Sequence, residues 1–153
     1  MLIGVERYDD VIGEAAPMLK EHYHELSAHK DIELDPDFEL YEKLSAAGAL
    51  RVYTVRDGST IFAPLVGYAL FFIRKHMHYK QAGWAVNDLV WLHPKFRNFG
   101  AGSKLVDFWD ADLAELGIHV VRVDTKAHSP ALERLLVVKG YGVIGSIIEK
   151  RLV

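Results

Sequence analysis

Residues 89–116, LVWLHPKFRNFGAGSKLVDFWDADLAEL, carry the clearest structural pattern in the chain. β-forming residues come first, a basic loop with the spacing R-x-x-G-x-G follows from Arg97 to Gly102, and apolar residues then recur at helical spacing. The pattern predicts a strand, a glycine-bearing turn and a helix N-terminus, in which the N–H groups of Gly102, Ser103 and Lys104 lack intrahelical partners. Because such N–H groups and the helix dipole attract anions, we interpret the segment as a cradle for a phosphate or pyrophosphate.

Two other phosphate-binding patterns fit this segment less well. A P-loop requires Gly-Lys followed by Ser or Thr, which does not occur in this sequence. A dinucleotide-binding fingerprint requires a G-x-G-x-x-G turn directly after a strand. Gly100 and Gly102 approach that spacing, and Asp124 imitates the ribose-binding acid, but the strand is expected to end too early, near Leu92. An NAD-binding fragment therefore stays open only as a weaker alternative.

The composition is that of an ordinary globular protein. The 153 residues are 50% hydrophobic and 25% charged, and the net charge of −3 argues against nucleic acid as a partner. The absence of cysteine excludes disulfides and thiolate chemistry. The N-terminus resembles no signal peptide, and no apolar run approaches ~20 residues, so we expect no membrane span and a cytoplasmic location.

The periodicity of the remaining sequence predicts alternating strands and helices. Expected strands are 2–7, 50–56, 65–75, 84–92 and 118–124, with one or two short strands in the tail 141–153, and expected helices begin near Asp9, Asp37, Gly100 and Ser129. No linker or internal repeat divides the chain, so residues 1–153 are expected to form one α/β domain with a mixed sheet.

The predicted strand, the step His93–Pro94, the R-x-x-G-x-G loop and the following helix resemble motif A of the GNAT superfamily of acyl-CoA-dependent N-acetyltransferases. The order of elements is similar to that of the family over essentially the whole chain. The resemblance implies a GNAT-like fold, with a mixed, mostly antiparallel central sheet of six to seven strands and about four flanking helices. It also implies acetyl-CoA as the acyl donor and no metal.

Residues for acetyl-CoA binding follow from the same resemblance. It assigns the pantetheine arm to the end of the motif strand, the pyrophosphate to backbone N–H groups of the loop, and a further contact to the next helix, where the family usually has an asparagine. The residues at these positions are Val90, Trp91 and Leu92; Arg97, Asn98, Phe99, Gly100, Ala101, Gly102 and Ser103; and Ser129.

The reaction that the resemblance implies is direct transfer of an acetyl group to a primary amine in a ternary complex, with a small molecule or a peptide as the acceptor. A carboxylate near the acceptor usually removes the proton of the ammonium, and Asp88 is the candidate for this catalytic base. It has the same strand parity as Val90 and Leu92 in an apolar run, where burial raises the pKa of a carboxyl group. Two other interpretations stay open. Asp88 lies near the sheet edge or pairs with a backbone group or an arginine, or a bulge shifts the parity and brings in Asn87.

The chain departs from the family pattern at Leu136, which stands where a tyrosine usually protonates the leaving thiolate. Tyr141, in the family's Gly-aromatic ending, is a substitute or, more simply, a core residue. A second interpretation is therefore a CoA-binding regulatory module with little or no catalysis. A homodimer is a possible assembly for either.

Two clusters of polar residues have both a plain and a functional interpretation. The acidic run in residues 31–42 is most simply a solvated connector, but its field would favour a polyamine, an aminoglycoside or a lysine-bearing acceptor. His22, His24 and His29 are most simply solvated surface residues, with the lining of an acceptor cleft as the alternative. Their spacing does not suggest a metal site.

Overall fold

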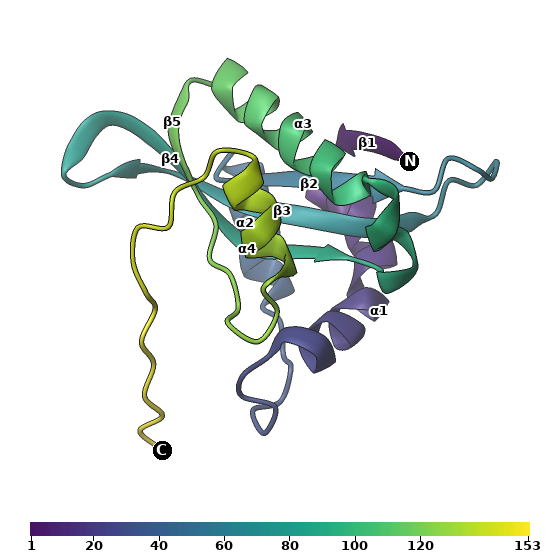
Figure 1. The fold of residues 1–153 in the computed structure, drawn as a ribbon, viewed down its shortest axis with the longest axis horizontal. Helices are drawn as coiled ribbons and strands as arrows, with labels where there is room; N and C mark the ends of the chain where they lie inside the picture. The colour runs from purple at the N-terminus through teal and green to yellow at the C-terminus, as the bar shows by residue number, and fades with distance from the viewer.

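A five-stranded sheet forms the centre of the molecule, which the computed structural model describes over residues 1–153 (Figure 1). Its strands, in the order in which they lie in the sheet, are β1 (Leu2–Val5), β2 (Leu50–Arg56), β3 (Leu65–His76), β4 (Tyr79–Leu92) and β5 (Ile118–Arg122). The first four strands are antiparallel to their neighbours, and β5 runs parallel to β4. The mixed, mostly antiparallel sheet is therefore confirmed, and it is not the parallel sheet of a dinucleotide-binding fold.

Helices cover both faces of the sheet (Figure 1). The α-helices are α1 (Tyr8–Leu26), α2 (Phe38–Ala46), α3 (Ala101–Glu115) and α4 (Ala131–Val138), and a 3-10 helix, η1 (Pro94–Phe99), joins β4 to α3. Helices α1 and α2 pack on one face, and α3 and α4 pack on the other. The expected set of about four flanking helices is thus present.

The alternation of side chains along the central strands builds a separate core on each face. Val52 and Leu70 point toward α1 and α2, whereas Tyr53 and Phe71 point toward α3 and α4. Trp109 of α3 is fully buried against this second face and meets Phe71 edge to face, with ring centroids 5.2 Å apart. The two cores hold the loop between β4 and α3 at one end of the sheet.

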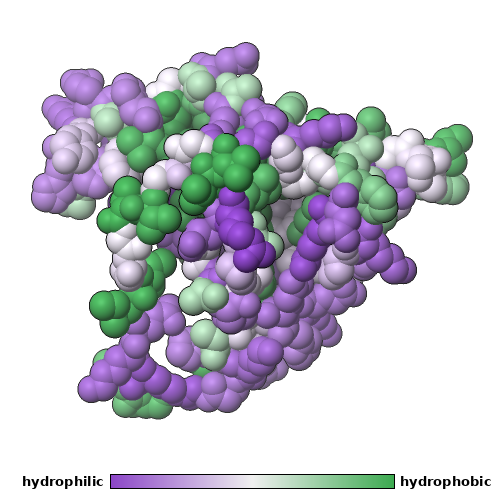
Figure 2. Space-filling model, in the orientation of Figure 1, coloured by the Kyte–Doolittle hydropathy of each residue, from purple (hydrophilic) through white to green (hydrophobic).

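The C-terminal tail differs from the expectation. Residues 141–153 form no strand, so the sheet has five strands rather than six to seven. A strand exists only where a neighbouring strand satisfies its backbone groups, and no segment pairs with this tail. Its apolar side chains lie on the surface, and Figure 2 shows hydrophobic groups along the tail. Ile144 and Ile148 are 82% and 92% exposed.

Two smaller features complete the fold. Strand β4 begins at Tyr79 rather than near Trp84, because it pairs with β3 along a long hairpin that extends beyond the helices (Figure 1). None of the helices combines the length and the apolar character that crossing a membrane requires.

Candidate acetyl-CoA and acceptor site

The R-x-x-G-x-G residues lie in the turn between β4 and α3. Gly100 follows η1 with φ +72°, a left-handed conformation that glycine adopts without steric cost, and the chain turns here into α3. The first hydrogen bond of α3 runs from Lys104 N–H to Gly100 O (3.1 Å), so the N–H groups of Gly102 and Ser103 have no acceptor within the helix. The expectation of a free N–H at Lys104 was wrong, because the helix starts early enough to bond it.

The loop residues on either side of Gly100 differ in exposure. Asn98 and Phe99, at the end of η1, are exposed, whereas Ala101 is buried in the core beneath α3. A Cβ atom on Gly100 would have no neighbouring atom within 4 Å. The turn is therefore open on that side, with no side chain filling the space.

Helix α4 packs against the start of α3. A Cβ atom on Gly102 would lie only 3.3 Å from Leu135 Cδ2, so the missing side chain of this glycine permits close packing of the two helices. Ser129 lies in the turn before α4, where its N–H donates to Lys126 O (2.8 Å). The second glycine of the motif thus has a structural task that the sequence pattern did not indicate.

The Arg97 side chain is directed at α1. Its Nη1 and Nη2 donate to the two carboxylate oxygens of Glu25 (2.6 and 2.7 Å), and its Nε donates to Leu92 O (2.7 Å). Trp91 Nε1 donates to the same carboxylate (2.9 Å). The hydrogen bonds from Arg97, with the one from Trp91, hold the pKa of Glu25 below its usual range against the opposing effect of burial. Arg97 therefore fixes the loop to α1 and the end of β4, and its charge is already balanced by Glu25.

The end of β4 has a partner strand on one side only. Strand β5 pairs with β4 no further than Val86, which lies opposite Arg122. Beyond this point the strands are bridged by a hydrogen bond from Asp124 N–H to Asn87 Oδ1 (2.7 Å). The residues that follow, including Val90, Trp91 and Leu92, therefore present an edge without a strand partner, on the side away from β3.

A β-bulge in β4 lies at Asp88. Leu70 of β3 pairs with Leu89 and Phe71 pairs with Asn87, so Asp88 is an extra residue with no partner in the ladder. The bulge reverses the alternation of side chains along the strand. As a result Asp88 and Leu89 line the same pocket, on the α1 and α2 side of the sheet.

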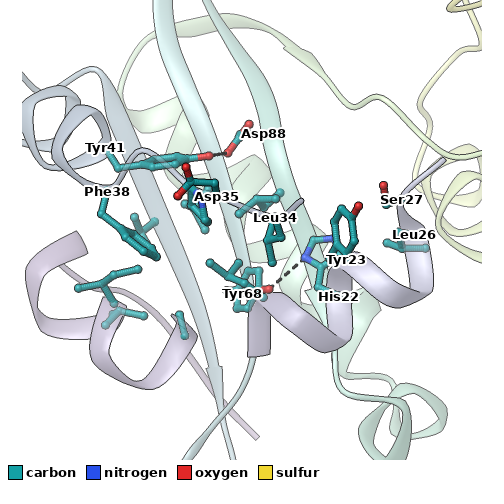
Figure 3. Close-up of a pocket in the computed structure, with 18 of the residues that line it drawn as sticks. His22, Tyr23, Leu26, Ser27, Leu34, Asp35, Phe38, Tyr41, Tyr68 and Asp88 are labelled. Atoms are coloured by element: carbon teal, nitrogen blue, oxygen red, sulfur yellow. Dashed lines mark hydrogen bonds between the residues drawn. The ribbon is translucent and has the colours of Figure 1, made fainter. Parts of the chain in front are cut away.

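The expected parity of Asp88 was therefore wrong. Val90 packs on the α3 side, whereas the Asp88 carboxylate points toward α2 and accepts a hydrogen bond from Tyr41 OH (Figure 3). Burial raises the pKa of Asp88 above its ordinary value, and the hydrogen bond from Tyr41 opposes that effect. The partner of Asp88 is therefore the hydroxyl of Tyr41 rather than a backbone group or an arginine. The bulge turns Asp88 rather than Asn87 into the pocket.

A pocket of about 450 Å³ lies in front of Asp88. It is bounded by α1, by the connector in residues 27–37, by α2 and by strands β2 to β4 (Figure 3). At its opposite end His22 Nδ1 and Tyr68 OH form a buried hydrogen bond of 3.0 Å. None of residues 97–103 lines this pocket. This cavity and the glycine turn are thus separate places, and the end of β4 lies between them.

His22 is buried, so the interpretation of it as a solvated surface residue was wrong. Its ring stacks on Trp91 with the centroids 6.1 Å apart. Burial lowers the pKa of His22 to about 4, so the ring is neutral at pH 7. A signal was present in the sequence, because His22 falls between Leu19 and Leu26 on the apolar stripe of α1.

Leu136, at the position where the GNAT resemblance implies a general acid, is an aliphatic residue. Leu136 is buried in the core. Tyr141 OH donates to Asp110 Oδ1 (2.5 Å) and accepts a hydrogen bond from Trp109 Nε1 (3.0 Å). Burial also raises the pKa of Tyr141. These contacts agree with the packing interpretation of Tyr141.

The histidines are dispersed. His29 pairs with Glu149 (3.1 Å), and His76 packs against Trp84 with the rings tilted by 35° and their centroids 4.4 Å apart. The structure contains no group of three or more histidine and acidic side chains placed to hold a metal ion.

A model of the Acetyltransferase (GNAT) family matches residues 16–141. This range begins within α1 and includes every later helix and strand of the chain. The chain belongs to the GNAT acetyltransferase family. A search of proteins with curated functions finds no significant match.

Solved structures share the fold over nearly the full chain. The ribosomal-protein-alanine N-acetyltransferase of Brucella melitensis biovar Abortus 2308 has a TM-score of 0.73 at 17% identity, covering 99% of this chain and 100% of that one. An aminoglycoside acetyltransferase from an uncultured soil metagenomic sample, in complex with sisomicin, has a TM-score of 0.75 at 13% identity, covering 99% and 95%. A predicted acetyltransferase from Clostridium acetobutylicum, with acetyl-CoA, has a TM-score of 0.71 at 12% identity, covering 98% and 96%. At these identities the likeness shows a common fold.

Proposed function

We propose that this protein transfers an acetyl group from acetyl-CoA to a primary amine by direct transfer in a ternary complex. The observation that carries the proposal is the arrangement around the end of β4. Its unpaired edge lies between the open glycine turn and a pocket into which the Asp88 carboxylate points. Family membership and a neighbour solved with acetyl-CoA support this choice of acyl donor. We propose a cytoplasmic location for this activity.

The two halves of the proposed site would hold the two substrates. The N–H groups of Gly102 and Ser103 would bind the pyrophosphate, and the free edge from Val90 to Leu92 would pair with the pantetheine arm. Neutral backbone donors fit this task, since the Arg97 charge is already paired with Glu25. Fixing both substrates in this way would supply most of the rate, because positioning alone can contribute ~7–11 kcal/mol.

Asp88 would act on the acceptor amine. A primary ammonium with a pKa of ~10.4 must lose a proton to react, at a cost of roughly 4.6 kcal/mol at pH 7. Asp88 would accept this proton, directly or through a water molecule, and pass it to solvent. Acetyl-CoA supplies the thioester, whose carbonyl carbon forms a bond to the amine nitrogen while the carbon–sulfur bond breaks. The acylated nitrogen would then lose its second proton to the thiolate sulfur, which gives the amide and the free thiol.

Release of free thiol from acetyl-CoA in the presence of a panel of amines tests the proposal. We expect amine-dependent thiol release and an acetylated product of the corresponding mass. Acetyl-CoA that neither binds nor is consumed with any amine of the panel would disprove it.

A regulatory CoA-binding module is the second candidate. Two observations favour it. Leu136 is buried and has no proton to donate to a leaving thiolate. The hydroxyl group of Tyr141 is already hydrogen-bonded to Asp110 and Trp109. The two functions differ in one measurement. A module binds acetyl-CoA but releases no thiol above the uncatalysed rate with any amine.

A further inference from the structure

The pocket in front of Asp88 is small and largely apolar. Fifteen of the 23 residues that line it are hydrophobic. Its volume of about 450 Å³ lies in the lower part of the ~300–1,000 Å³ range of small-molecule pockets, which suits a compact ligand. Burial of a polyhydroxylated or multiply charged body in such a space would leave polar groups without partners.

The connector between α1 and α2 encloses the pocket on one side. Ile32, Leu34 and Pro36 of this connector face the cavity together with Phe38 of α2. Tyr23 OH donates to the backbone oxygens of His29 (2.8 Å) and Ile32, which fixes the connector to α1. A pocket walled by a helix, a sheet and a fixed connector suits a compact molecule better than an extended peptide.

The charged groups of the pocket favour a cationic ligand, because three carboxylates and one lysine line it. Asp88 lies beside Tyr41, and Asp35 lies on the same side of the pocket (Figure 3). Glu33 is the third carboxylate of the lining. Lys126 is the only lysine or arginine among the lining residues. Tyr41 is itself held by stacking on Tyr8, with the ring centroids 5.8 Å apart.

We infer that this pocket selects a primary monoamine whose nitrogen is joined by a short linker to an aromatic or branched apolar group. The ammonium lies toward Asp88, and the apolar group occupies the space between Leu34, Phe38 and Leu70. This inference rests on the proposed transferase function for the fate of the amine. It restricts the range of acceptors to such monoamines. Polyamines, aminoglycosides and lysine-bearing peptides, which the acidic run by itself would favour, are excluded.

Calorimetric binding without acetyl-CoA tests the inference independently of catalysis. The probes are 2-phenylethylamine, its carboxylate counterpart 3-phenylpropionate, spermidine, kanamycin and a lysine-bearing hexapeptide. We expect 2-phenylethylamine to bind at least about tenfold more tightly than each of the others. Equal or tighter binding of spermidine, kanamycin or the peptide overturns the inference, as does equal binding of 3-phenylpropionate, and so does the absence of any binding.

A matched pair of substitutions identifies the pocket as the place of binding. Leu34→Asn puts a polar amide into the apolar wall, and we expect it to weaken 2-phenylethylamine binding about tenfold. Leu40→Asn makes the same change on the outer side of α2, outside the pocket, and should leave the affinity unchanged. Equal effects of the two variants would overturn the assignment to this pocket.

Thiol release separates the two levels of the argument. If acetyl-CoA is consumed with spermidine or kanamycin but not with 2-phenylethylamine, the transferase proposal stands and the inference about the acceptor fails. If 2-phenylethylamine binds in the pocket and no amine is acetylated, the transferase proposal fails while the ligand class of the pocket is supported.

Discussion

Protonation of His22 should destabilise the folded protein strongly. Burial lowers the pKa of His22 from 6.5 to about 4, with Arg97 and Lys126 acting in the same direction and Glu25 opposing them. Since each pKa unit corresponds to ~1.4 kcal/mol, placing a proton on this ring costs about 3 kcal/mol more in the folded protein than in the unfolded chain. The corresponding stability is fully present above pH 6.5 and is lost as the pH falls toward 4.

The measurement is urea denaturation at several pH values between about 4 and 7.5 on the wild type and on His22→Gln, which keeps a polar group near Tyr68 but does not titrate. We expect the free energy of unfolding of the wild type to fall by about 3 kcal/mol more than that of the variant over this range. The same substitution at His24, an exposed neighbour on α1, is the matched control and should follow the wild type.

Two results would refute the reasoning. One is a parallel loss of stability in the wild type and in His22→Gln, which would mean that other groups account for the pH dependence. The other is an NMR titration of the His22 ring with an ordinary midpoint near 6.5, which would show that the ring is solvated in the folded protein.

Three further predictions concern the proposed site. Asp88→Asn should lower kcat by roughly 10²–10⁴-fold with little change in the Kd for acetyl-CoA. Because the pKa of Asp88 is raised, the activity of the wild type should fall with decreasing pH, starting at a higher pH than an ordinary aspartate would give. The variant should not show this loss of activity at low pH. If the pH profile of the variant equals that of the wild type, Asp88 has no part in the mechanism. Ser103→Glu should weaken acetyl-CoA binding while retaining the fold, since an acidic residue suits the first turn of a helix. Ser103→Gln is the uncharged control. Equal affinities of the two variants for acetyl-CoA in isothermal titration would count against the cradle. Glu25→Gln should lower the free energy of unfolding by ~1 kcal/mol at neutral pH, because it breaks the partly exposed pair with Arg97. The depressed pKa of Glu25 means that this difference should disappear as the pH falls below its ordinary value of 4.5, and a difference that persists there would contradict the ion-pair explanation.

Gly102 is a poor position for testing the cradle. A side chain there would meet Leu135 of α4 before it met a ligand. A loss of binding in a Gly102 variant would therefore mix an effect on helix packing with an effect on the anion. Ser103, one residue later in the same turn, avoids this overlap.

Local sequence was sufficient for the framework of the site. The periodicity of residues 50–56 predicted β2 with its observed bounds, and the R-x-x-G-x-G spacing predicted the turn at Gly100 between the end of β4 and α3. These features depend on the preferences of neighbouring residues, such as the ease with which glycine takes a positive φ. For the same reason the order of elements from β1 to α4 could be predicted, and only the tail beyond Gly140, which needs a partner strand, could not.

Tertiary structure alone decided what occupies the site. Asp88 faces the pocket because a register shift against β3 reverses the alternation of β4, and no local pattern marks that shift. Arg97 is paired with Glu25, 72 residues earlier, and His22 is buried against Tyr68, 46 residues later. Such contacts arise from the way in which α1 packs across the sheet. The sequence therefore determined the backbone of the proposed acetyl-CoA cradle. The packing of distant elements determined which charges are free, which are paired and which side chains enclose the proposed acceptor pocket.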